Sequence, residues 1–166
     1  MEYRIGIEKD ETNKYSVKTL EYIKGILHSF ANLNEPSSNL GFDYEIVEFE
    51  KSNNISKSLK KRFYIFDNQQ IELVGITQDT FLNKLKVWFY SNGELRNIQV
   101  SERKQEDYLN HFLRLLKDIL DITEILGIEN LKSENEKVYL ELGIDYDYFV
   151  LNSPEKNYIL YFTFCD

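Results

Sequence analysis

The chain has 166 residues, of which 42% are hydrophobic and 29% are charged, and its net charge is −8. This length and composition are typical of one globular domain over residues 1–166, and they exclude a disordered or fibrous protein. Because no apolar run approaches the roughly 20 residues of a membrane span and Met1–Arg4 lacks the start of a signal peptide, we expect a cytoplasmic protein without a membrane partner.

The first predicted elements are a strand and a helix. Tyr3, Ile5 and Ile7 alternate with polar residues, which predicts a strand with one buried face. Over residues 15–33 the apolar side chains recur at helical spacing and form one stripe, which predicts a long helix. Pro36 follows this stripe and restricts its predecessor to extended backbone, so the helix is expected to end there.

The next strand carries a shift in its apolar pattern. Phe42, Tyr44 and Ile46 share one face, and the apolar positions then move to Val47 and Phe49. Because alternate residues of a strand face opposite sides, such a shift by one position is typical of a β-bulge. We therefore predict a bulge near Ile46-Val47.

Residues 51–77 predict a loop followed by two strands. Residues 51–62 are polar and basic, and a solvated loop is expected there. Alternating apolar residues predict strands at 61–67 and 70–77, joined by a tight turn at 68–69.

The dipeptide Asn92-Gly93 predicts a β-hairpin, because both residues tolerate the positive φ of a type I′ turn. Basic and aromatic residues alternate on one face of this hairpin: Lys84, Lys86, Trp88, Tyr90 and Leu95. An exposed face of this kind would be a stacking platform for single-stranded nucleic acid or a homodimer contact. The alternative is that the sheet curls and buries Trp88 in the core.

A second long helix is predicted from Ser101, which suits an N-cap, to Leu126. Its apolar residues cover more than half of its circumference, and Gly127 would supply the left-handed stop. Two closing strands are then predicted, one starting near residue 138 and the other over 157–165, with the turn between them at 153–156.

The order of these elements predicts an α+β fold in two layers. We expect a mostly antiparallel sheet of about six to eight strands with two main helices on one face. The predicted hydrophobic core joins the second helix, Leu116 included, to strand residues. These strand residues are Ile5, Ile7, Val87, Ile98, Leu160 and Phe162.

Charge is concentrated towards the C-terminus. Residues 118–166 hold eleven acids and three bases, whereas the preceding residues are balanced. A strand in this region carries tyrosines among acids, and the predicted partner-binding residues are Tyr139, Glu141, Asp145, Tyr146, Asp147 and Tyr148. Acids repel nucleic acid and attract cations, so a basic protein is the expected partner.

Few residues offer catalytic chemistry. His28 and His111 lie on predicted helices without a partner at a zinc-binding spacing, and we interpret them as histidines at the edge of the core. Cys165 is the single cysteine and lies on a predicted strand without a nearby base, so it is interpreted as a small apolar residue. No catalytic residue, metal or cofactor is therefore expected.

The sequence thus favours a non-catalytic binding or inhibitor protein that covers a basic partner with an acidic, tyrosine-rich surface. Examples are an immunity protein against a nuclease toxin and a phage protein that blocks a host defence enzyme; the AT-rich codons of the abundant residue types agree with a bacterial or phage source. One alternative is a metal-dependent enzyme or ligand-binding domain that uses Glu141, Asp145 and Asp147. Another is a nucleic-acid-binding module that uses Trp88 and Tyr90.

Overall fold

The computed structural model describes residues 19–35, 41–67, 70–129 and 145–165. Its elements, in chain order, are α1 (Leu20–Asn34), β1 (Gly41–Phe49), α2 (Ile55–Arg62), the 3-10 turn η2 (Tyr64–Phe66), β2 (Glu72–Gly75), α3 (Gln78–Lys86), the π-helical turn η3 (Val87–Ser91), the 3-10 turn η4 (Glu94–Asn97), α4 (Glu102–Leu120), β3 (Glu124–Glu129), β4 (Asp145–Asn152) and β5 (Asn157–Cys165). The predicted strand at residues 3–7 and the start of the one near residue 138 lie outside the described residues.

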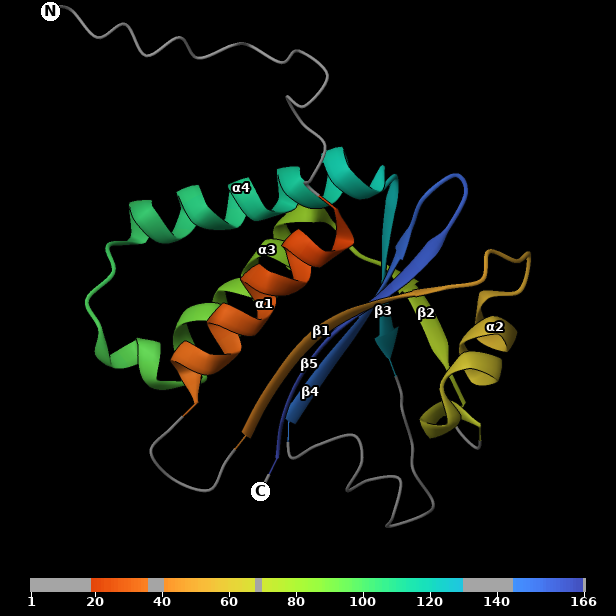
Figure 1. Cartoon of the computed structure of the whole chain (residues 1–166), viewed down its shortest axis with the longest axis horizontal. Coiled ribbons are helices and arrows are strands. Elements are labelled where there is room, and N and C mark those ends of the chain that lie inside the picture. Colours follow the sequence, from red (N-terminus) through yellow and green to blue (C-terminus); the bar gives the residue numbers. More distant parts are fainter. Residues whose placement is uncertain (1–18, 36–40, 68–69, 130–144, 166) are drawn as a thin grey trace, which may run out of the picture.

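The fold is α+β, with an antiparallel sheet in the strand order β1-β5-β4-β3-β2 (Figure 1). The predicted class and the antiparallel sheet are confirmed. The expected six to eight strands and two main helices are not, because the described part of the chain contains five strands and four α-helices. Helices α1, α3 and α4 cover one face of the sheet, which we call the helix-covered face. Helix α2 packs on the opposite face.

Strand β1 pairs with β5 residue for residue over its full length. The predicted bulge near Ile46-Val47 is therefore wrong. Ile46 packs in the large core beneath the helices, whereas Val47 and Phe49 contact the smaller cluster beside α2. The shift in apolar pattern thus reflects a regular strand whose two faces are covered by different elements.

The basic segment at residues 51–62 contains a helix instead of the predicted loop. The Asn54 side chain caps α2 by accepting a hydrogen bond of 2.9 Å from the backbone N–H of Lys57. Leu59 is fully buried, and the three basic residues of the last turn lie at the helix end that favours cations. Because Leu59 is the only buried apolar residue of α2, the helix has no apolar stripe that could be recognised in the sequence.

The predicted strand at 61–67 is also wrong, because the end of α2 and the turn η2 occupy this range. Phe66 in η2 is fully buried and packs edge-on against Tyr148, with ring centroids 5.6 Å apart. Strand β2 lies inside the range 70–77 where a strand is predicted, and residues 68–69 lie outside the described ranges.

The segment around Asn92-Gly93 is helical rather than a hairpin. Helix α3 continues into the π-helical turn η3, and φ is −83° at Asn92 and −124° at Gly93, so neither has the positive φ of a type I′ turn. Phe81, Leu85 and Trp88 are buried at helical spacing. This period overrides the strand-like alternation on which the hairpin prediction depended.

Buried Asn34 holds this turn against the end of α1. Its Nδ2 donates to the carbonyl oxygens of Trp88 (3.3 Å) and Phe89 (3.0 Å), and its Oδ1 accepts from the backbone N–H of Leu95 (3.1 Å). A Cβ atom at Gly93 would lie 2.4 Å from the Cβ of Asn34. Glycine is therefore required here by close packing and not by a left-handed backbone.

Helix α4 ends at Leu120, earlier than predicted. Asp121 has φ 55° and supplies the left-handed stop that the sequence assigned to Gly127, which instead lies inside β3. The apolar residues of β3 had widened the apparent stripe of the helix. By contrast, the closing turn is confirmed: the N–H of Ser153 donates to the carbonyl of Lys156 at 3.0 Å, between β4 and β5.

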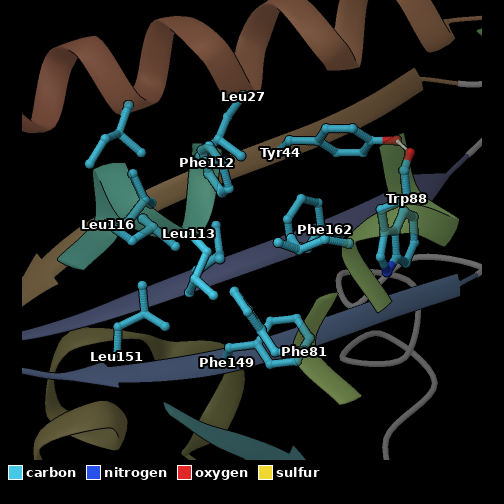
Figure 2. Packing of buried hydrophobic residues seen from close by; sticks show 14 of the residues in the cluster. Leu27, Tyr44, Phe81, Trp88, Phe112, Leu113, Leu116, Phe149, Leu151 and Phe162 are labelled. Carbon is cyan, nitrogen blue, oxygen red and sulfur yellow. Dashed lines mark hydrogen bonds between the residues drawn. The ribbon is translucent and has the colours of Figure 1, made fainter. Parts of the chain in front are cut away.

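The main core lies between the helix-covered face and helices α1, α3 and α4 (Figure 2). Leu116, Leu160 and Phe162 are fully buried in it, as predicted. Val87 and Ile98 were expected there but are 44% and 58% exposed, because their segment is helical. The remaining predicted members, Ile5 and Ile7, lie outside the described residues. In the described ranges, no helix combines the length and apolar character of a membrane span.

Candidate functional site

Strand alternation divides the predicted partner-binding residues between two faces of the sheet. Asp145 and Asp147 lie on the helix-covered face of β4, whereas Tyr146 and Tyr148 lie on the opposite face. Asp145 is exposed, Tyr146 is half-buried and Tyr148 is buried. Tyr139 and Glu141 lie outside the described residues, so the structure does not bring the six predicted residues together in one surface.

Asp147 is engaged by two donors of its own chain. Its Oδ1 accepts from the Lys84 ammonium at 2.5 Å, and its Oδ2 accepts from the Trp88 indole N–H at 2.8 Å. This carboxylate therefore joins β4 to α3 and η3 and satisfies the only polar atom of a buried indole ring. These contacts give Asp147 a structural role.

The second predicted surface, around Trp88, does not form a stacking platform. Trp88, Tyr90 and Leu95 are 1%, 7% and 8% exposed, which leaves no ring face for a base. Lys84 pairs with Asp147, and Lys86 lies 3.5 Å from Glu102. The alternative in which Trp88 belongs to the core is the one the structure shows (Figure 2).

A different set of acids and tyrosines meets on the face opposite the helices. The register places Glu45, Tyr161 and Tyr148 in one row across β1, β5 and β4, and it places Asp43, Thr163 and Tyr146 in the next row. The Tyr148 ring lies 5.6 Å from that of Tyr161 and 5.7 Å from that of Tyr146. We call Asp43, Glu45, Tyr146, Tyr148 and Tyr161 the acidic tyrosine face.

The two carboxylates of this face influence each other. Partial burial and the negative charge of Glu45 raise the pKa of Asp43, while the Tyr161 hydroxyl, which donates a hydrogen bond to it, and His28 oppose this rise. Burial raises the pKa of Tyr161 well above its usual range, and the charge of Asp43 adds to the effect. Tyr161 is therefore neutral at physiological pH, and a cation placed beside Asp43 would relieve the repulsion between the acids.

Glu45 turns towards the outer edge of β1. Its Oε1 accepts from the backbone N–H of Ile46 at 2.9 Å, and its Oε2 lies 2.9 Å from Nε2 of His28 on α1. His28 is thus exposed and pairs with Glu45 on the surface, so its predicted place at the edge of the core is wrong. Glu45 itself is only 22% exposed.

The described residues contain no group of three or more His, Cys, Asp or Glu side chains that could hold a metal ion. His111, predicted at the edge of the core, is instead exposed on α4 and lines an open hollow of about 360 Å³ with Asp107 and Arg114. Cys165 ends β5 and pairs through its backbone with Gly41. Glu141, which the metal-site alternative requires, lies outside the described residues.

Asp43, Glu45 and Tyr161 were not predicted from the sequence. A signal was present, because residues 41–50 contain four acids and no base, and the first two acids alternate with the apolar residues that share one face of that strand. Their neighbours could not be found in the same way, since the pairing of β1 with the distant β5 has no local signature.

Comparison with models of protein families, with curated proteins and with solved structures gave no significant match to this chain.

Proposed function

We propose that this protein is a non-catalytic binding protein that covers the basic surface of a partner protein with its acidic tyrosine face. Inhibition of a partner whose working surface is basic, such as a nuclease toxin, is the corresponding biological role. As predicted from the sequence, the proposed surface combines acids with tyrosines. It is centred on strands β1, β5 and β4 instead of on the predicted residues 139–148.

The observation that carries the proposal is the pair of cross-strand rows. Six neighbouring positions on three strands hold two acids, three tyrosines and a threonine, of which Tyr148 and Thr163 are buried, and none of the six is Lys or Arg. By contrast, Asp147 on the other face is paired with a lysine. Within the described residues, neither the Asp43 nor the Glu45 carboxylate has a salt bridge to a lysine or arginine, although Glu45 contacts His28.

Tyrosine and carboxylate would have separate tasks in such a surface. Tyr146 and Tyr161 are half-buried and already held by the sheet, so they would bury ring area against a partner with little further loss of side-chain freedom. Asp43 and Glu45 would attract a cationic partner over longer distances and speed its approach. Such steering is screened over about 8 Å at physiological salt.

The test uses a partner captured by the wild-type protein from cell extract and then purified. Asp43→Lys with Glu45→Lys is expected to weaken binding by at least about tenfold, mainly through a slower association rate. The matched control is Glu106→Lys with Asp118→Lys, which makes the same charge change at exposed positions of α4 and is expected to bind nearly as the wild type. Unfolding midpoints would verify that both variants fold.

A third variant separates this surface from the one predicted from sequence. Glu141→Lys with Asp145→Lys changes the C-terminal acids and leaves β1 intact. If only this variant lost binding, the partner surface would lie where the sequence predicted it, and the acidic tyrosine face would not be the binding site. Equal binding by all three variants would contradict an acidic binding surface altogether.

A further inference from the structure

We propose that the outer edge of β1 binds an extended, basic segment of the partner as an additional antiparallel strand. This inference rests on the proposed function and specifies how the partner would be held. It adds main-chain hydrogen bonds to the charge contacts of Asp43 and Glu45. Pairing of an extended segment with a sheet edge is a general mode of peptide recognition.

Strand β1 has the features of an open edge. It comes first in the strand order, spans nine residues, and pairs only with β5 within the described part of the chain. The pairing with β5 is regular, so the opposite side presents an uninterrupted row of backbone groups. Long regular edges of this kind are templates for a further strand unless the protein blocks them.

The contacts of Ile46 show which backbone groups face outwards. Its N–H donates to the Glu45 carboxylate and is therefore not used by β5. Because the donors and acceptors of an antiparallel strand alternate between its two sides, the N–H and C=O groups of Phe42, Tyr44 and Glu48 share the side of Ile46. The residues between them bond to β5.

Glu45 occupies the position that a partner strand would take. Its Oε1 lies on the Ile46 N–H, where the carbonyl oxygen of an added strand would lie, and His28 holds its other oxygen. A partner carbonyl could replace this oxygen, and a lysine or arginine of the partner could pair with the released carboxylate. In the free protein the same contact satisfies the N–H group and protects the edge from unspecific pairing.

The charge of β1 determines which segment fits. Residues 41–50 hold four acids and no base. Glu48 and Glu50 each pair with an exposed lysine, at 2.8 Å and 3.2 Å, whereas Asp43 and Glu45 have no such partner among the described residues. A second copy of β1 would place acids beside acids, which is unfavourable across a strand pair. An alternating basic segment would place cations beside them.

The experiment uses the full chain and three synthetic nine-residue probes. One has alternating lysine and valine, the second is the same peptide with N-methyl groups on the amides that would face β1, and the third has glutamate in place of lysine. Backbone hydrogen exchange followed by NMR reports the N–H groups of Phe42, Tyr44, Ile46 and Glu48 on the outer side. Those of Asp43, Glu45 and Val47 serve as internal controls.

In the free protein, the outer amides of Phe42, Tyr44 and Glu48 are expected to exchange faster than the control amides, whereas the Ile46 N–H is already bonded to Glu45. The lysine peptide is expected to slow exchange of the outer amides by at least about tenfold, whereas the N-methylated and glutamate peptides should not. Glu45→Gln retains an oxygen beside the Ile46 N–H but lacks the charge, so it should bind the lysine peptide several-fold more weakly.

Each contrary result has a distinct meaning. Equal binding of the lysine peptide and its N-methylated form would overturn strand addition, while the acidic binding surface would remain supported. Failure of both to bind would contradict the acidic surface as well. Protection of the Phe42, Tyr44 and Glu48 amides in the free protein would show that the edge is occupied, by a second copy if sedimentation gives a dimer and by another segment of the same chain if it gives a monomer, and either result would overturn the proposal.

Discussion

Asp147 and Asp43 lie on neighbouring parts of one sheet but face opposite sides of it. Asp147 points towards the helices, where an ammonium and an indole N–H bind its two oxygens. Asp43 lies on the opposite face, where its neighbours are a tyrosine hydroxyl and a second carboxylate, and its pKa is raised. The charge of Asp147 is paired with Lys84 inside the fold, whereas Asp43 has no lysine or arginine partner among the described residues. Residue type alone does not separate a structural acid such as Asp147 from an acid proposed to bind a partner; the groups around each carboxylate do.

The same contrast holds for the aromatic residues of the two faces. On the helix-covered face, Trp88 stacks on Phe162 with ring centroids 5.7 Å apart, and both are buried. On the acidic tyrosine face, Tyr161 and Tyr146 remain half-exposed beside acids. Substitutions on the helix-covered face should therefore change stability, and those on the acidic tyrosine face should change binding.

The largest effect is expected in the main core. Leu116→Ala removes a fully buried side chain and should lower the free energy of unfolding by about 2–5 kcal/mol, measured by chemical denaturation. Val87→Ala is the control, because Val87 is 44% exposed although the hairpin prediction placed it in the core. Equal losses from the two substitutions would mean that Val87 is buried and that the helical segment is wrong.

A smaller loss is expected at the close contact between Asn34 and Gly93. Gly93→Ala would place a Cβ atom 2.4 Å from the Cβ of Asn34, and overpacking of this kind costs about 1–3 kcal/mol. Gly25→Ala in α1 is the control, since its Cβ would meet no atom within 4 Å and alanine favours a helix. Thermal unfolding should show opposite shifts for the two variants, and a stable Gly93→Ala variant would contradict the packing of η3 against α1.

Asp147→Ala tests the structural acid directly. It leaves the buried indole N–H of Trp88 without its acceptor and should lower stability by about 1–3 kcal/mol. Asp147→Asn retains an acceptor and should lose less. The NMR signal of the indole N–H is expected to shift strongly in the alanine variant, and binding of a basic partner by the folded fraction should be unchanged. Loss of binding at full stability would make Asp147 part of the partner surface.

The smallest expected effect has the opposite sign. Because the pKa of Asp43 is raised in the folded protein, the folded state retains this proton at pH values where the unfolded chain has lost it, so stability falls as pH rises through that interval. Asp43→Asn removes this penalty and should slightly raise the unfolding midpoint at pH 7, with no gain in acid where Asp43 is protonated. The same variant should bind a basic partner more weakly. A destabilised Asp43→Asn variant would show that this acid is structural, like Asp147.

The sequence supported predictions of those parts of the fold that depend on local signals. The hairpin of β4 and β5 has a turn at Ser153–Lys156 between apolar strands, and helix α1 has a clear apolar stripe. At residues 84–97 the strand period and the helix period both fit the sequence, and the hydrogen bonds of Asn34 to this segment, which the sequence does not show, help to hold the helical form. The acidic tyrosine face shares Tyr146 and Tyr148 with the surface predicted from the sequence, whereas Asp43, Glu45 and Tyr161 were not predicted, since their place beside these tyrosines depends on the pairing of β1 with β5.

That pairing has a consequence for how the protein is made. β5 lies between β1 and β4, so β1 has no neighbour in the described sheet until residues 157–165 have been synthesised. Tyr44 and Ile46, fully buried in the folded protein, therefore cannot reach their positions beside β5 until most of the chain has been synthesised. Contacts between such distant segments also slow folding after release. The edge that we assign to a partner is thus among the last parts of the sheet to form, and any partner bound there would find it only on the completed molecule.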